Sequence, residues 1–94
     1  MNLWVDDLRQ PPEGWDWARS SSEALAMLKA NIYQVMSLDH DLGGDDTTRT
    51  VVLHLAEFGN WPDEVRVHTA NPPGRYWLEG MINRYGPGVS HYTF

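Results

Sequence analysis

Aspartates gather in two short segments of this 94-residue chain, 6–7 and 39–46, which hold six of its eight aspartates. Carboxylate oxygens are the ligands that hard divalent cations prefer. Carboxylates that are held close together repel one another and raise each other's pKa values until a cation lies between them. The pattern predicts a metal site for Mg²⁺ or Mn²⁺, with helix capping or solvated turns as the alternative for any single aspartate. The predicted ligands are Asp6, Asp7, Asp39 and Asp41.

His40 lies between two of these aspartates, and its role has two interpretations. In an extended segment the side chains of Asp39 and Asp41 point the same way, and His40 points the opposite way. Because imidazole titrates near neutral pH, His40 is a candidate general acid or base. It could equally be a partly buried histidine whose ring is satisfied by a backbone group. Asp41 could likewise offer a metal its carboxylate or only its backbone carbonyl.

A polar segment in the second half of the chain has the composition of a phosphate-binding surface. Asn71 and the proline that follows it predict the start of a helix, whose free N–H groups and positive dipole end attract anions. Thr69 could donate its hydroxyl to a phosphoryl oxygen, and Arg75 could bind phosphate bidentately. His68 is a second candidate for moving a proton. The alternative is that Asn71 only caps the helix, Thr69 packs and Arg75 is solvated.

Alternating strands and helices position these polar segments. Short apolar runs predict strands at residues 2–5, 15–18, 35–38 and 65–68, with a further short strand in residues 87–94. Capping signals, helical periodicity and glycine stops predict helices from Ser20 to about Asn31, from about Asp46 to Phe58, and from Asn71 to Tyr85. The tryptophans, five in total, are expected to fill the core and the flanks of the sheet.

This alternation indicates an α/β domain, residues 1–94, with a mostly parallel sheet and helices on both faces. In such sheets ligands bind beyond the carboxyl ends of the strands. The Asp6–Asp7 pair follows the first strand, Asp39 the third and His68 the fourth, so these side chains should converge. The first connection is short for a parallel crossover. Either a loop replaces its helix, or residues 15–18 pair differently.

The composition excludes several classes of protein. The chain has no cysteine, which rules out disulfides and thiolate metal sites. It has no apolar stretch of the ~20 residues that cross a bilayer and no signal-peptide pattern, so a cytoplasmic protein without a membrane partner is expected. The net charge is −6 and Lys29 is the only lysine, which argues against an extended nucleic-acid surface. A phosphate-containing small molecule or a nucleic-acid end remains a suitable partner, and the oligomeric state is open.

Three segments resemble the receiver domains of two-component signalling, and still more the branch called cyclic-phosphate processing receiver domains. They read Asp-Asp-Leu-Arg at 6–9, Ser-Leu-Asp-His-Asp-Leu-Gly at 37–43 and His-Thr-Ala-Asn-Pro-Pro-Gly-Arg at 68–75. The resemblance covers residues 3–85. It implies a flavodoxin-like fold with strand order 2-1-3-4 and activity on cyclic phosphates or phosphorylated ends. Ordinary receivers also carry a lysine after a fifth strand, and this sequence has none there.

The favoured function is therefore metal-dependent processing of a phosphoester, with catalytic candidates His68, His40 and Asp39 and phosphate-binding candidates Thr69, Asn71 and Arg75. Two rival functions fit the same residues. One is a signalling receiver that is phosphorylated on Asp39. The other is a binding module that keeps the fold and the metal but has no turnover. The missing lysine argues against the signalling rival.

Overall fold

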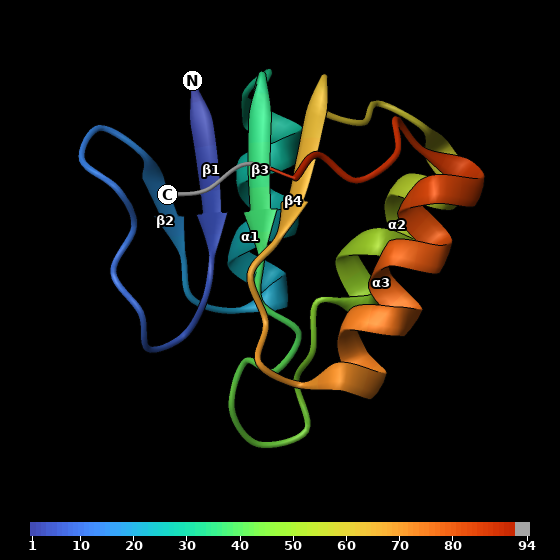
Figure 1. Cartoon of the computed structure of the whole chain (residues 1–94). Helices are drawn as coiled ribbons and strands as arrows, with labels where there is room; N and C mark the ends of the chain where they lie inside the picture. Colours follow the sequence, from blue (N-terminus) through green and yellow to red (C-terminus); the bar gives the residue numbers. More distant parts are fainter. Residues whose placement is uncertain (92–94) are drawn as a thin grey trace.

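The computed structural model describes residues 1–91 and contains four strands and three helices. The strands are β1 (Asn2–Val5), β2 (Asp16–Ala18), β3 (Val35–Leu38) and β4 (Glu64–Val67). The helices are α1 (Ser21–Ala30), α2 (Arg49–Phe58) and α3 (Pro72–Tyr85). All strand pairs are parallel and the order is β2-β1-β3-β4, as the sequence predicts (Figure 1). The carboxyl ends of all four strands therefore lie along one edge.

Three boundaries differ from the sequence-based prediction. The second strand begins at Asp16 rather than at residue 15, and β4 is displaced by one residue, so that His68 lies just beyond it. Helix α2 begins at Arg49 rather than near Asp46. The intervening loop instead folds back on itself, because Leu42 N–H donates to the Asp46 carbonyl at 3.0 Å. Two glycines with positive φ make this turn, and the loop ends are closed by an antiparallel bridge.

One face of the sheet forms the core. Alternate strand residues are fully buried there: Leu3, Val5, Met36, Leu38 and Val65. They belong to the same apolar cluster as buried residues of the helices. Helix α1 lies behind the sheet, whereas α2 and α3 pack against each other beside β4 (Figure 1). The strands are thus anchored from one side, and their polar ends are left at the lower edge in this view.

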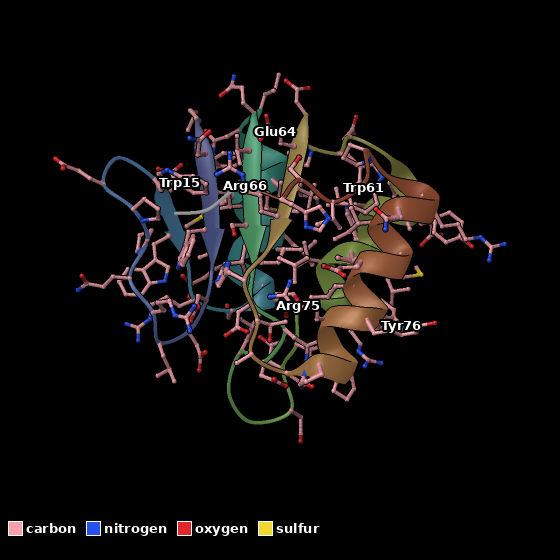
Figure 2. All side chains as sticks on the ribbon, viewed as in Figure 1. Trp15, Trp61, Glu64, Arg66, Arg75 and Tyr76 are labelled. Carbon is pink, nitrogen blue, oxygen red and sulfur yellow. The ribbon has the colours of Figure 1, made fainter. Side chains whose placement is uncertain are left out.

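The opposite face carries aromatic and polar side chains. Trp4, Ser37 and Arg66 occupy one row, since Trp4 pairs with Ser37 and Ser37 with Arg66. Trp15 packs edge-on against Trp4, with ring centroids 6.0 Å apart, and Arg66 lies over the Trp15 ring (Figure 2). Tryptophans therefore cover this face as the sequence predicts, and the face leads directly to the carboxyl edge.

The first crossover contains no helix, and a loop connects β1 to β2. The two strands are parallel, with Leu3 opposite Asp16. Side chains close the loop in place of a helix: Trp4 Nε1 donates to the Arg9 carbonyl at 2.8 Å. Of the two sequence-based alternatives for this crossover, replacement of the helix by a loop is correct.

The predicted last strand is reduced to one isolated contact in the described part of the chain. Val89 forms a parallel bridge with Val65, and Ser90 N–H donates to the Val65 carbonyl at 2.8 Å. Residues 92–94 of that predicted strand lie outside the described residues. Within residues 1–91, no helix is long and apolar enough to span a bilayer.

A buried tyrosine ties β2 to the start of β3 and gives the fold a testable pH dependence. Tyr33 donates its hydroxyl to Asp16 Oδ2 at 2.7 Å. Burial, and then the Asp16 carboxylate, raise the pKa of Tyr33 from 10 to about 12. Because the folded pKa exceeds the unfolded pKa, this contribution is complete below pH 10 and is lost as the pH rises towards 12.

We therefore expect the free energy of unfolding to fall by about 2–3 kcal/mol between pH 10 and pH 12. Denaturant titrations at several pH values measure this fall. The matched control is Tyr33→Phe, which should show a smaller decrease because phenylalanine has no hydroxyl group to lose a proton. Equal decreases in the two proteins would show that Tyr33 is not the source.

Candidate functional site

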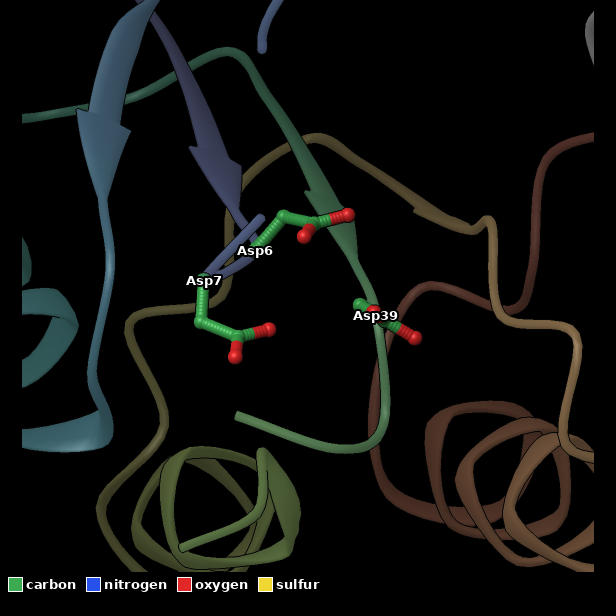
Figure 3. A group of neighbouring side chains, drawn as sticks. All are labelled: Asp6, Asp7 and Asp39. Atoms are coloured by element: carbon green, nitrogen blue, oxygen red, sulfur yellow. The ribbon is translucent and has the colours of Figure 1, made fainter. Parts of the chain in front are cut away.

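Three carboxylates from neighbouring strand ends face one another at the carboxyl edge. Asp6 and Asp7 follow β1, and Asp39 follows β3, its hydrogen-bonded neighbour in the sheet. Each offers one oxygen, and these three oxygens lie within 4.8 Å of one another (Figure 3). Asp6 is buried and the other two are half-buried. An all-oxygen, triply acidic set of this kind fits a hard divalent cation such as Mg²⁺ or Mn²⁺.

Asp6 is held in its ionised form by three hydrogen bonds. Its Oδ1 accepts from the backbone N–H groups of Leu8 and Arg9, both at 2.9 Å, and Oδ2 accepts from His68 Nε2 at 2.9 Å. Burial alone raises the pKa of Asp6, but the two backbone donors and His68 outweigh it and leave the pKa below its usual value. The carboxylate is therefore charged and fixed in direction at neutral pH.

The backbone of the acidic pair is held by side chains from the β2 side. Trp17 Nε1 donates to the Asp6 carbonyl at 2.7 Å. Arg19 donates to the Asp7 carbonyl twice, from Nε at 3.2 Å and from Nη2 at 2.9 Å. Sequence reasoning did not assign these two residues, because it left the pairing of residues 15–18 open. The parallel β1–β2 pair places them beside the acidic pair.

Asp7 and Asp39 are positioned by the loop that precedes α2. A Cβ at Gly43 would lie 3.2 Å from Asp7 Oδ2, and Gly43 has a φ of +88°, so this turn approaches Asp7 closely. Asp39 Oδ1 accepts from His40 N–H at 2.7 Å, and the Asp39 carbonyl accepts from Thr48 Oγ1 at 2.6 Å. Within residues 1–91 no hydrogen bond reaches Asp39 Oδ2, which leaves that oxygen available.

His40 has no free ring nitrogen, which argues against the predicted role in proton transfer. Arg49 Nε donates to His40 Nε2 at 2.8 Å, so the ring proton lies on Nδ1 and is donated to Asp41 Oδ1 at 3.1 Å. The second Asp41 oxygen accepts from Asn71 Nδ2 at 3.0 Å. The hydrogen bond from Asn71, and then the one from His40, lower the pKa of Asp41. The Asp41 carboxylate therefore lies outside the three-carboxylate cluster, contrary to its prediction as a metal ligand, and the alternative in which Asp41 offers a metal its backbone carbonyl stays a prediction.

The His40 ring packs directly on the first turn of α3. A Cβ added to Gly74 would lie 2.5 Å from His40 Cγ, closer than any side chain tolerates. Gly74→Ala should therefore lower the free energy of unfolding by about 1–3 kcal/mol, the usual cost of overpacking. Gly80→Ala is the matched control on the same helix, because a Cβ there meets nothing within 4 Å. That control should raise stability by up to about 1 kcal/mol. Denaturant titration measures both, and equal effects would contradict the close packing.

His68 joins the aspartates, as predicted, but both of its ring nitrogens are engaged. Its Nε2 donates to Asp6, and its Nδ1 lies 2.7 Å from Ser37 Oγ, which is fully buried. The ring stacks on Trp4 with centroids 3.8 Å apart. Burial lowers the pKa of His68, and the hydrogen bond with Asp6 only partly opposes this effect. The neutral ring thus orients the Asp6 carboxylate.

The start of α3 has no free N–H group, which argues against the predicted anion site at this helix end. Pro72 and Pro73 carry no N–H. Gly74 N–H donates to Asn71 Oδ1 at 3.1 Å, and Arg75 N–H donates to the Asn71 carbonyl at 2.8 Å. Asn71 therefore caps the helix, which is the alternative considered from the sequence. Its side-chain amide is committed to Asp41, so Asn71 has a structural role.

Two arginines reach consecutive carbonyls after β4. Arg75 Nη2 donates to the Thr69 carbonyl at 2.9 Å, and its Nη1 lies 3.4 Å from Glu79 (Figure 2). Arg9 Nη1 donates weakly to the His68 carbonyl at 3.4 Å. Thr69 itself is buried, and its Oγ1 accepts from the backbone. The predicted residue Arg75 thus lies at the correct edge, and Arg9 joins it. The sequence signal for Arg9 was its place two residues after the acidic pair, in the Asp-Asp-Leu-Arg segment.

The sequence matches the family model described as "Cyclic-phosphate processing Receiver domain" over residues 1–84. The chain belongs to this family. Searches of curated proteins and of solved structures gave no significant match. The parallel sheet of order 2-1-3-4 is that of a small flavodoxin-like receiver fold.

This receiver-like domain has no lysine at the carboxyl edge within residues 1–91. Its single lysine, Lys29, lies in the last turn of α1. It lines a groove of about 470 Å³ between α1 and α2, together with Ile32, Leu55 and Trp61. The groove contains none of the predicted site residues. The positive charge at the aspartate edge comes from arginines instead.

Proposed function

We propose that this domain holds Mg²⁺ or Mn²⁺ at Asp6, Asp7 and Asp39 and hydrolyses a phosphoester, for which a cyclic phosphate is the favoured substrate. The observation that carries the proposal is the convergence of three carboxylate oxygens within 4.8 Å at the edge where such sheets bind ligands. Membership of the cyclic-phosphate processing family supports the choice of substrate. The substrate would be a cytoplasmic small molecule or a nucleic-acid end.

The residues around the cluster have separate roles in this proposal. His68 orients Asp6, and Asp39 presents its unengaged Oδ2 towards the reacting group as the acceptor for a water proton. Arg75, aided by Arg9, offsets the charge that grows on the phosphoryl oxygens. A divalent cation at the carboxylates would polarise the phosphoryl group and lower the pKa of a bound water.

The reaction balances without any co-reactant. The water oxygen forms a bond to phosphorus as one ring P–O bond of the cyclic phosphate breaks. The water proton passes to Asp39, and the leaving alkoxide is protonated by Asp39 or by solvent. The product is an acyclic phosphomonoester with a free hydroxyl. The carboxylate of Asp39 is regenerated at the end of the cycle.

A substrate panel tests the proposal. Nucleoside 2′,3′-cyclic phosphates, 3′,5′-cyclic phosphates and simple phosphomonoesters are incubated with Mg²⁺, with Mn²⁺ or with a chelator, and products are followed by phosphorus NMR. We expect ring opening of a cyclic phosphate that depends on the metal. Metal binding without turnover of any member would favour the non-catalytic binding module.

The second candidate function is a signalling receiver, and it rests on the unengaged Asp39 Oδ2 beside the acidic pair. An aspartyl phosphate there would have no lysine to contact at the edge described in residues 1–91. Incubation with a small phosphodonor and Mg²⁺, followed by intact-mass measurement, separates the two functions. A long-lived phosphoryl adduct that Asp39→Asn abolishes would support signalling.

A further inference from the structure

Charged residues form an ordered row along the carboxyl edge. In the sheet order β2-β1-β3-β4, Arg19 follows β2, the acidic pair follows β1 and Asp39 follows β3. The carbonyl that holds Arg75 belongs to the segment after β4. The three-carboxylate cluster therefore has an arginine on each flank. Arg75 is assigned to the reacting phosphate, whereas Arg19 has no assigned ligand.

The side chain of Arg19 is fixed in place by neutral partners. Its Nε and Nη2 both donate to the Asp7 carbonyl, at 3.2 and 2.9 Å. Its guanidinium carbon lies 5.0 Å from the centroid of the Trp17 ring. Within residues 1–91 no carboxylate forms an ion pair with Arg19, and the residue is exposed. Its Nη1 group makes no hydrogen bond among the described residues, so it can donate to a ligand.

We propose that Arg19 binds a second phosphate group of the substrate, on the flank opposite Arg75. The inference rests on the proposed function and narrows its substrate class. The substrate would be a nucleotide or nucleic-acid end that carries a cyclic phosphate at the metal cluster and another phosphate nearby. A guanidinium that is preorganised and unpaired loses little freedom when it binds a phosphate oxygen.

The spacing of the strands sets the distance between the two phosphates. Adjacent strands lie about 4.8 Å apart, so a group at Arg19 is roughly 5–10 Å from a group at the cluster. Two phosphates on one nucleotide unit can span such a distance. The cation at the cluster would also offset the net charge of −6, which otherwise opposes a doubly anionic ligand.

The variant Arg19→Gln separates ligand binding from a purely structural role. The amide N–H of the glutamine, at the position of Arg19 Nε, can still donate to the Asp7 carbonyl, so one of the two hydrogen bonds to that backbone is kept while the charge is lost. Arg19→Lys is the complementary variant, because it keeps the charge on a shorter donor group. Arg84→Gln is the matched control, since Arg84 is an exposed arginine in the last turn of α3, away from the carboxyl edge.

The probes are a nucleoside 2′,3′-cyclic phosphate with and without a 5′-phosphate. Wild type should have a KM for the 5′-phosphorylated probe that is roughly tenfold or more lower, as expected for one charge-assisted hydrogen bond. Arg19→Gln should remove this preference, so that the ratio of the two KM values falls to about 1, and any change in KM that both probes share cancels in that ratio. Arg19→Lys should restore part of the preference, and Arg84→Gln should behave as wild type.

Equal KM values for the two probes in wild type would overturn the second phosphate site and leave the proposed function standing. So would an Arg19→Gln variant that loses Mg²⁺ affinity and both activities together, because that result assigns Arg19 a structural role only. If wild type turns over neither probe, the second phosphate site fails, and the proposed function fails as well only if the 3′,5′-cyclic phosphates of the substrate panel are also left intact.

Discussion

Asp39→Asn should reduce metal-dependent ring opening by at least about 100-fold, because it removes both a metal ligand and the proposed proton acceptor. The substitution is nearly isosteric, and the asparagine oxygen can still accept from His40 N–H, which Asp39 Oδ1 does at 2.7 Å. The fold should therefore persist. Removing one of three charges that lie within 4.8 Å should also weaken Mg²⁺ and Mn²⁺ binding.

Calorimetric titration with each metal and initial hydrolysis rates measure the two effects separately. Asp63→Asn is the matched control, since Asp63 is an exposed aspartate outside the cluster, in the loop before β4. It should leave metal affinity and rate unchanged. Equal metal affinity in wild type and Asp39→Asn would remove Asp39 from the metal site. Unchanged turnover would remove it from the reaction.

The sheet and its acidic edge could be predicted because both depend on short, local sequence patterns. Each central strand is a short apolar run that is followed directly by an aspartate: Val5 precedes Asp6, and Leu38 precedes Asp39. In a parallel sheet the aspartates that follow the strands lie at one edge, and this placement can be predicted without knowing any side-chain contact. The three-carboxylate cluster follows from that topology alone, as the structure bears out. Asp41 does not join it, because its oxygens bind His40 and Asn71.

The roles of individual polar residues could not be predicted in the same way, because they depend on partners distant in the sequence. The engagement of His40 by Arg49 and of His68 by Asp6 appears only when the loops are placed. The lack of free N–H groups at the start of α3 is different, because it could be read from the local sequence. Two consecutive prolines at the start of a helix carry no N–H groups, whatever the fold.

Arg75→Ala should weaken phosphate binding by about 1.5–3 kcal/mol in the presence of Mg²⁺, the usual worth of a hydrogen bond to a charged group. In the absence of metal, wild type should bind phosphate very weakly, because the net charge of −6 and the cluster oppose an anion. Glu79 competes for the same guanidinium, with its oxygen 3.4 Å from Arg75 Nη1. Glu79→Gln should therefore strengthen metal-dependent phosphate binding.

Titration of inorganic phosphate into wild type, Arg75→Ala and Glu79→Gln, with and without Mg²⁺, tests these expectations together. Arg84→Ala is the control, because Arg84 lies on the same helix as Arg75 but in its last turn. Arg75 is already anchored on the Thr69 carbonyl, so little side-chain freedom remains to be lost when phosphate binds. Phosphate binding that needs no metal, or an Arg75→Ala variant with wild-type affinity, would show that the phosphate lies elsewhere. Opposite shifts in the two variants, both dependent on Mg²⁺, would tie the guanidinium and the carboxylate cluster to one ligand.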